Sequence, residues 1–109
     1  MDESHYLELV ADAYRKIEDA LEEVDPGDVD VNPGGDVLTL TLADGVRCVV
    51  NTQRATRQIW VAARATAWHF SYQETGETAG RWIDDHGKGE LFENLATIIR
   101  QGSKIEVKF

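Results

Sequence analysis

Acidic side chains gather in the first 30 residues of this chain, at spacings that suit the binding of a cation. The segment holds eleven Asp and Glu residues and two bases, so it carries the whole formal net charge of −9, and residues 31–109 are balanced. Carboxylate oxygens are preferred ligands of hard cations such as iron(III), Mn²⁺, Ca²⁺ and Mg²⁺. The candidate ligands, which we call the acidic ridge, are Glu18, Asp19, Glu22, Glu23, Asp25, Asp28 and Asp30.

The spacing of the ridge residues works against helix stability. Glu18 and Glu22 stand four residues apart, as do Asp19 and Glu23, and like charges at this spacing destabilise a helix by about 0.2–0.5 kcal/mol per pair. A helix face that is merely solvated is the alternative interpretation. If the ridge does bind cations, its openness to water predicts weak, salt-sensitive binding at several sites.

The other candidate ligands and nucleophiles are sparse. His5 follows Asp2 and Glu3 and could share a metal with them, although a plain surface histidine is the simpler interpretation. The three histidines lack the spacings of zinc hydrolases. Cys48 is the single cysteine and has no neighbouring base to activate it, so we expect a structural role. We therefore expect no catalytic residues.

Trp60 is the unusual residue of the balanced part of the chain. Its two chain neighbours are β-branched and alternate to the inside of a strand expected over 58–63, which places Trp60 and Gln58 on the outer face. Asn51 and Gln53 lie where the chain leaves the preceding strand, at the matching end. A tryptophan among amides and arginines is typical of an interaction hot spot. The alternative is that a loop folds over it. The arginines expected around it are Arg54, Arg57 and Arg64.

Hydrophobic periodicity predicts one helix at each end of the chain and strands between them. The helices are expected over 3–24, with Ser4 as N-cap, and over 88–101, with Gly102 as C-cap. The expected strands are 28–31, 37–42, 47–51, 58–63, 67–72 and 82–83, and the tail 104–109 is either an added strand or a strip packed against the helices.

This order of elements is typical of an α+β fold. We expect a single domain over 1–109, built as a two-layer α-β sandwich. Its two terminal helices pack on one face of a five- to seven-stranded antiparallel sheet, and the other face meets solvent.

Charge and hydropathy exclude several classes of partner. An acidic protein without a basic stripe is a poor ligand for nucleic acid or for an anionic membrane surface. No run of 18 apolar residues is present. The acidic N-terminus is unlike a secretory signal or a transit peptide, so we expect a cytoplasmic protein.

Several motifs, taken in order, resemble the frataxin family, and its bacterial CyaY branch in particular. The most specific is Asn51-Thr52-Gln53 followed by Gln58-Ile59-Trp60-Val61-Ala62, which is similar to the family's N-x-Q…Q-[IV]-W core. The resemblance covers essentially the whole chain. Supporting matches are the acidic helix 17–23, the strand 35–42 with Asp44-Gly45, Trp68-His69-Phe70 and Leu91-Phe92-Glu93-Asn94-Leu95.

The resemblance implies a non-enzymatic regulator or adaptor of iron–sulfur cluster assembly in the bacterial cytoplasm. It implies weak iron binding at the acidic ridge and no organic cofactor. The implied partners are a cysteine desulfurase with a basic surface and the scaffold protein. These partners would meet the sheet surface at Asn51, Gln53, Arg54, Gln58 and Trp60.

The resemblance leaves the oligomeric state and two functional alternatives open. A monomer is expected, with iron-dependent oligomers as the alternative. The functional alternatives are an interaction module with incidental metal binding and a ferroxidase-like iron store. The chain departs from the family pattern at Thr52, where Lys or Arg is usual, and in the long loop Gln73–Gly80. It departs also at Ala65-Thr66, which replaces the family's small, Gly-containing turn.

Overall fold

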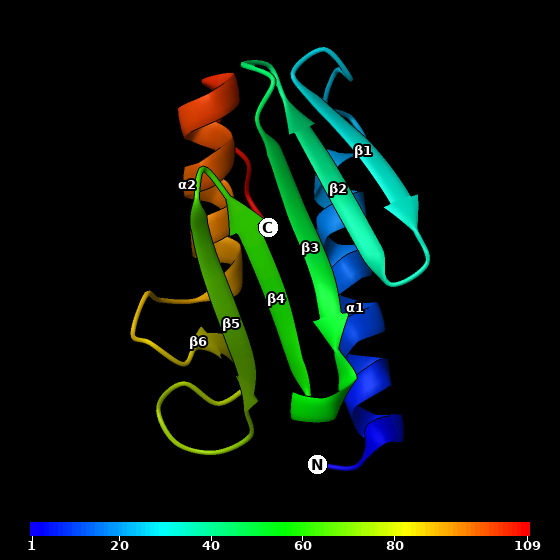
Figure 1. The fold of residues 1–109 in the computed structure, drawn as a ribbon, viewed down its shortest axis with the longest axis vertical. Helices are drawn as coiled ribbons and strands as arrows, with labels where there is room; N and C mark the ends of the chain where they lie inside the picture. The colour runs from blue at the N-terminus through cyan, green and yellow to red at the C-terminus, as the bar shows by residue number, and fades with distance from the viewer.

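Six strands pair antiparallel with their chain neighbours, so their order in the sheet is their order in the sequence (Figure 1). The computed structural model describes all 109 residues, and none of its helices is long and apolar enough to cross a membrane. A short 3₁₀ turn, η1 (Arg54–Thr56), joins the third and fourth strands. The helices are α1 (Glu3–Leu21) and α2 (Leu91–Ser103), and the strands are β1 (Val29–Gly34), β2 (Val37–Leu42), β3 (Arg47–Gln53), β4 (Gln58–Ala63), β5 (Thr66–Gln73) and β6 (Arg81–Asp84).

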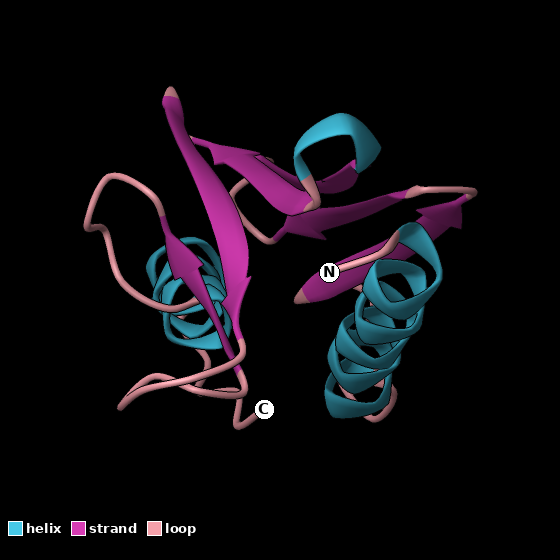
Figure 2. Ribbon diagram, turned by 90° about the horizontal axis from the view of Figure 1, so that it is seen from below, coloured by secondary structure: helices cyan, strands magenta, loops and turns pink.

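Both helices lie on the same face of the sheet, as the end-on view of Figure 2 shows. The predicted two-layer α-β sandwich is therefore confirmed. The C-terminal end of the chain lies between the helices as an irregular strip, not as a strand. Within this strip Val107 is buried, and the Phe109 ring packs 5.6 Å from that of Phe92.

The hydrophobic core fills the space between the sheet and the helices. Helix α1 turns a stripe at helical spacing inward, and the inward residues of the strands alternate as predicted. The side chains of two buried residues, Tyr6 and Ser103, tie distant parts of the chain together. The Tyr6 hydroxyl donates to the Gln58 carbonyl oxygen at 2.6 Å. The Ser103 hydroxyl donates to the Asp28 carbonyl oxygen at 2.6 Å and accepts from the Ala43 N–H at 3.1 Å.

The predicted start of α1 at residue 3 is confirmed, but its predicted N-cap is wrong, and α2 ends two residues after the predicted residue 101. Asp2, not Ser4, is the N-cap of α1, and its carboxylate accepts from the His5 N–H at 2.8 Å. Gly102 lies inside α2, where a Cβ would come within 2.5 Å of Leu42, and the left-handed C-cap is Lys104.

The predicted end of α1 and the predicted start of α2 are also wrong. Helix α1 stops at Leu21, three residues before the predicted end. Helix α2 begins at Leu91, not at residue 88, because Gly87 and Gly89 adopt positive φ angles and Glu90 caps the helix. The first strand begins at Val29, so Asp28 lies in the preceding turn and not in the strand as predicted.

The β4–β5 hairpin turns through two residues that are both left-handed without being glycine. Arg64 has φ 51° and Ala65 has φ 63°. Hairpins of this mirror-image type normally place Asn and Gly there, because only such residues adopt positive φ at low cost. The turn is centred one residue earlier than the predicted Ala65-Thr66, since Thr66 already pairs with Ala63.

Replacing the second turn residue should stabilise the protein. We expect Ala65→Gly to raise the free energy of unfolding by about 0.5–1 kcal/mol, because the left-handed cost of about 1–2 kcal/mol exceeds the extra unfolded-state entropy of about 0.4–1 kcal/mol. Urea unfolding measures this. Ala62→Gly, the same change within regular strand β4, should lower the free energy. A decrease for Ala65→Gly would contradict the expectation.

Candidate docking face and acidic ridge

The sheet face turned away from the helices carries two parallel rows of side chains, which we call the outer face. Directly paired residues of antiparallel strands point to the same side of a sheet. The first row is Val37, Asn51, Trp60 and His69. The second row is Gln53, Gln58 and Ser71. The strand register therefore brings four of the five predicted partner-binding residues together.

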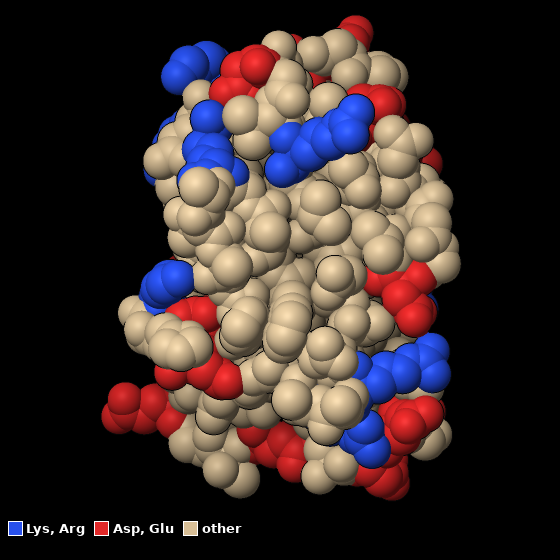
Figure 3. All heavy atoms as spheres, in the orientation of Figure 1, with Lys and Arg blue, Asp and Glu red and all other residues tan.

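The centre of the outer face carries no charge. Figure 3 looks onto this face in the orientation of Figure 1, and acidic and basic side chains appear only towards its ends and edges. A hollow of about 100 Å³ lies beside Trp60. The exposed alanines Ala62 and Ala67 line part of it. Such an apolar, uncharged patch resembles the core of a protein interface more than an ordinary surface.

Trp60 lies on the outer face, as predicted, but it packs flat on a neighbour. Its ring stacks on His69 with centroids 4.1 Å apart and planes 18° apart, and the indole Nε1–H donates to Gln58 Oε1 at 2.9 Å. These contacts leave the indole half-buried. One face of the Trp60 ring is therefore already covered by this histidine, which the sequence prediction did not include among the site residues.

Gln58 holds the edge of Trp60. Its side-chain amide donates to Ser71 Oγ at 3.0 Å and also to the carboxylate of Asp85. Its Oε1 accepts from the Thr56 hydroxyl at 3.0 Å as well as from Trp60. With 7% of its surface exposed, Gln58 orients Trp60 and offers little surface of its own to a partner.

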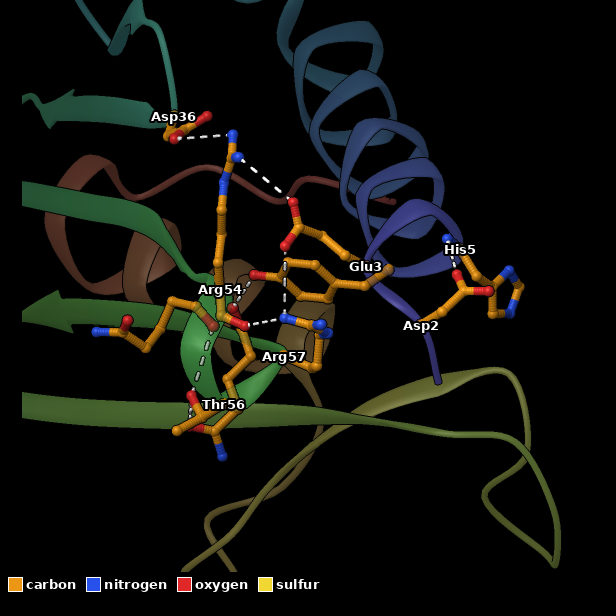
Figure 4. Close-up of polar contacts among 10 residues, drawn as sticks. Asp2, Glu3, His5, Asp36, Arg54, Thr56 and Arg57 are labelled. Carbon is orange, nitrogen blue, oxygen red and sulfur yellow. Dashed lines mark hydrogen bonds and ion pairs between the residues drawn. The ribbon is translucent and has the colours of Figure 1, made fainter.

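The three arginines do not surround Trp60, so that part of the prediction is wrong. Arg64 pairs with Asp44 at 2.6 Å in the hairpin turns at the far end of the sheet. Arg54 and Arg57 turn towards the N-terminus of α1, where both approach Glu3 at 3.8–3.9 Å (Figure 4). Arg54 also reaches Asp36 at 3.6 Å. These ion pairs join elements that are distant in the sequence, so the alternation of residues along one strand could not predict them.

The acidic ridge keeps most of its carboxylates free of protein partners. Glu18 and Asp19 lie in the last turn of α1, Glu22 is its C-cap and Glu23 follows. None of these four side chains makes a hydrogen bond or an ion pair, and the last turn contains no base. A groove of about 440 Å³ between α1 and β1 is lined by Glu18, Asp19, Glu22 and Asp30 among others.

The remaining predicted ligands have local contacts or lie elsewhere. The Asp25 carboxylate accepts from the Gly27 N–H at 2.7 Å, and that of Asp30 accepts from Asn32 Nδ2 at 3.0 Å. Asp2 caps α1 and Glu3 meets the arginines, at the opposite end of the helix from the ridge. No group of three or more His, Cys, Asp and Glu side chains is placed to hold one metal ion. The ridge is therefore a line of separate carboxylates, not a cage.

Two buried groups are structural. Burial raises the pKa of the Cys48 thiol to about 12, which leaves it protonated and unreactive at neutral pH. The buried Asp84 carboxylate fixes the loop after β6 by accepting from the N–H groups of His69, His86 and Lys88 at 2.9–3.1 Å. Burial alone would raise the pKa of Asp84, but these N–H groups and the charge of Lys88 lower it below its ordinary value.

The stabilisation from Asp84 should depend on pH. A carboxylate with a lowered folded-state pKa stabilises the protein fully above its unfolded pKa, and this contribution is lost as the pH falls through the folded pKa. We expect Asp84→Asn to cost about 1–3 kcal/mol at pH 7. The difference from wild type should shrink below about pH 4. Denaturant titrations at pH 7 and pH 3 measure it. Glu77→Gln on the exposed loop should show little difference at either pH, and a difference for Asp84→Asn that persists at pH 3 would contradict the assignment.

Comparison with known proteins finds one protein family that matches nearly the whole chain. The model of a frataxin-like domain matches residues 1–105. The iron-sulfur cluster assembly protein CyaY of Ralstonia pickettii is 37% identical over 111 residues, which cover 98% of this chain and 93% of the relative.

Two solved structures share the fold. The frataxin of Psychromonas ingrahamii superposes with a TM-score of 0.87 at 31% identity, covering 99% of this chain and 97% of that one. A trimeric frataxin of Saccharomyces cerevisiae complexed with ferrous iron superposes with a TM-score of 0.62 at 23% identity, covering 96% and 88% of the two chains.

Proposed function

This chain belongs to the frataxin family, and we propose that it is a non-enzymatic, iron-binding regulator of iron–sulfur cluster assembly. The observation that carries the proposal is the pairing of two surfaces on one small domain. One is a line of unpartnered carboxylates at the end of α1, and the other is a sheet face with an uncharged centre and Trp60 in its cross-strand row. The first suits a cation or a basic surface, and the second suits a protein.

Helix electrostatics supports cation binding at the acidic ridge. The C-terminal end of a helix carries about half a negative charge, and acids there are unfavourable. Glu18, Asp19 and Glu22 lie at that end of α1 with no base in the last turn. A cation near them relieves both the mutual repulsion of the carboxylates and their repulsion by the helix. Because no three ligands converge, we propose that iron binds weakly and at several places.

The same charge favours a basic partner. A concentrated negative patch steers a positively charged protein surface towards it and speeds association. The uncharged centre of the outer face then supplies apolar contact area. We propose a cysteine desulfurase and its scaffold protein as the partners, in line with the cluster-assembly function named for the Ralstonia relative. Asn51, Gln53 and Trp60 would contact them, and Gln58 would position Trp60.

Neutralising the ridge should separate iron binding from stability. We expect the variant Glu18→Gln, Asp19→Asn, Glu22→Gln, Glu23→Gln to lose the iron(II)-induced changes in the amide NMR signals of residues 18–30. In the absence of metal it should unfold with a higher free energy, by about 0.3–1 kcal/mol per residue at low salt, because the helix C-terminus no longer repels four charges.

A matched control changes the net charge equally but elsewhere. Glu74, Glu77, Glu93 and Glu106 are exposed, and replacing all four by glutamine should leave the iron response of residues 18–30 intact. If the ridge variant responds to iron like wild type, the metal part of the proposal is wrong.

Truncating Trp60 should weaken docking. We expect Trp60→Ala to reduce the affinity for the desulfurase–scaffold complex by about thirtyfold, as removing an interface hot spot costs about 2 kcal/mol or more. Phe92→Ala, a half-buried aromatic on the helical layer, is the control and should bind like wild type. Calorimetry measures both. Unchanged affinity for Trp60→Ala would remove the outer face from the docking surface.

The absence of a converging group of metal ligands supports one alternative function, an interaction module. A pure interaction module with incidental metal binding would dock with full affinity in the presence of a chelator, so the same titration with and without chelator distinguishes the two.

A ferroxidase-like store has less support. Buried di-iron sites use inward-facing carboxylates with histidine, whereas the ridge carboxylates at 18, 19, 22 and 23 are exposed. We propose a monomer as the working state.

A further inference from the structure

Two histidines meet at one side of the outer face. His69 projects from β5, and His86 lies in the loop between β6 and α2. Their ring centroids are 6.1 Å apart, with planes inclined at 67°. They lie 17 positions apart in the sequence, so helix or strand spacing does not indicate the pair. Only the return of the chain through β6 brings them together.

The surroundings hold both rings near one another. Trp60 stacks on His69 and fixes the plane of that imidazole. The Asp84 carboxylate binds the backbone N–H groups of both histidines, at 2.9 Å each, and so ties the loop to β5. The His86 side chain is exposed and keeps rotamer freedom. One imidazole is therefore fixed, and the other can adjust.

The ring nitrogens are free to bind a ligand. No hydrogen bond or ion pair of the structure uses a ring nitrogen of His69 or His86, whereas His5 Nε2 lies 3.3 Å from Glu74. The neighbouring Asp85 carboxylate bonds to Ser71, two residues along β5 from His69, at 2.8 Å. This carboxylate adds negative charge at the edge of the outer face, and the Asp85 N–H donates to the His69 carbonyl oxygen at 2.9 Å. Negative charge at this position favours a cation.

The separation suits a shared metal ion. With a metal–nitrogen distance of about 2.0–2.1 Å and a ring radius of about 1.1 Å, a metal lies about 3.2 Å from each imidazole centroid. Two rings that share a metal then have centroids about 5.2 Å apart at the tetrahedral angle, and about 4.5 Å apart at the 90° angle of tetragonal Cu²⁺. The observed 6.1 Å requires the exposed His86 ring to approach by about 1–1.6 Å, which a side-chain rotation provides.

We propose that His69 and His86 form a second metal site, distinct from the acidic ridge, for ions that prefer imidazole. Neutral imidazole suits Cu²⁺, Ni²⁺ and Zn²⁺, and Cu²⁺ binds most tightly of the three. Because no third protein ligand converges, water completes the coordination. The bound ion would sit beside Trp60, so occupancy of this site would compete with docking of a protein partner at the outer face.

Titration with Cu²⁺ in a non-coordinating buffer tests the proposal. We expect one ion to quench the tryptophan fluorescence, with the quenched component absent in Trp60→Phe. His86→Ala should weaken binding about tenfold or more, since even loss of an outer-shell partner costs about 10- to 100-fold in metal affinity. His69→Phe should do the same while keeping an aromatic ring under Trp60.

Two controls locate the ion. His5→Ala removes the third histidine, which lies in the first turn of α1. The four-residue ridge variant removes carboxylates of the acidic ridge. Both variants should bind Cu²⁺ like wild type. Equal affinity in wild type, His86→Ala and His69→Phe would overturn the proposal, as would loss of the quenching in His5→Ala or in the ridge variant. The result is independent of iron binding at the ridge and of desulfurase docking.

Discussion

The coverage of one sheet face by both helices is the constraint on which the rest of the structure depends. Alternation along each strand sends every second side chain into the core, and antiparallel register aligns the others in rows across neighbouring strands. Trp60 lies outside because Ile59 and Val61 are buried inside. The pattern that builds the core therefore also decides which positions lie on the outer face. The residue types at those positions could be selected without altering the packing of the core.

Gln58 connects the two layers at one point. Its carbonyl oxygen accepts the hydroxyl of Tyr6 from α1, and its side chain orients Trp60 on the opposite face. The acidic ridge lies at the other end of the same helix. The two proposed functional surfaces are therefore supported by a shared rigid element, although they differ in chemistry. One is charged and solvated, and the other is uncharged and shaped by stacking.

The sequence predicted the architecture well because periodicity is a local signal. The bounds of β2 and β4 match the predicted 37–42 and 58–63. Caps were missed because they depend on single side-chain bonds, as at Asp2. The arginines around Trp60 were misplaced, and the His69–His86 pair was not expected, because both depend on which loops return to which strand. Glu22 and Glu23 have no partners because the N-terminal segment holds many more acids than bases. This imbalance can be counted in the sequence.

Ser103 shows what this topology means for a growing chain. Its hydroxyl joins Asp28, 75 residues earlier, and Ala43 in the β2–β3 turn. Contacts of such long sequence separation slow folding, since the intervening loop must close before they form. Asp28 leaves the ribosome before α2 is synthesised, so its carbonyl oxygen has to wait for Ser103. The concentrated negative charge of residues 1–30 favours solubility of that segment during the interval.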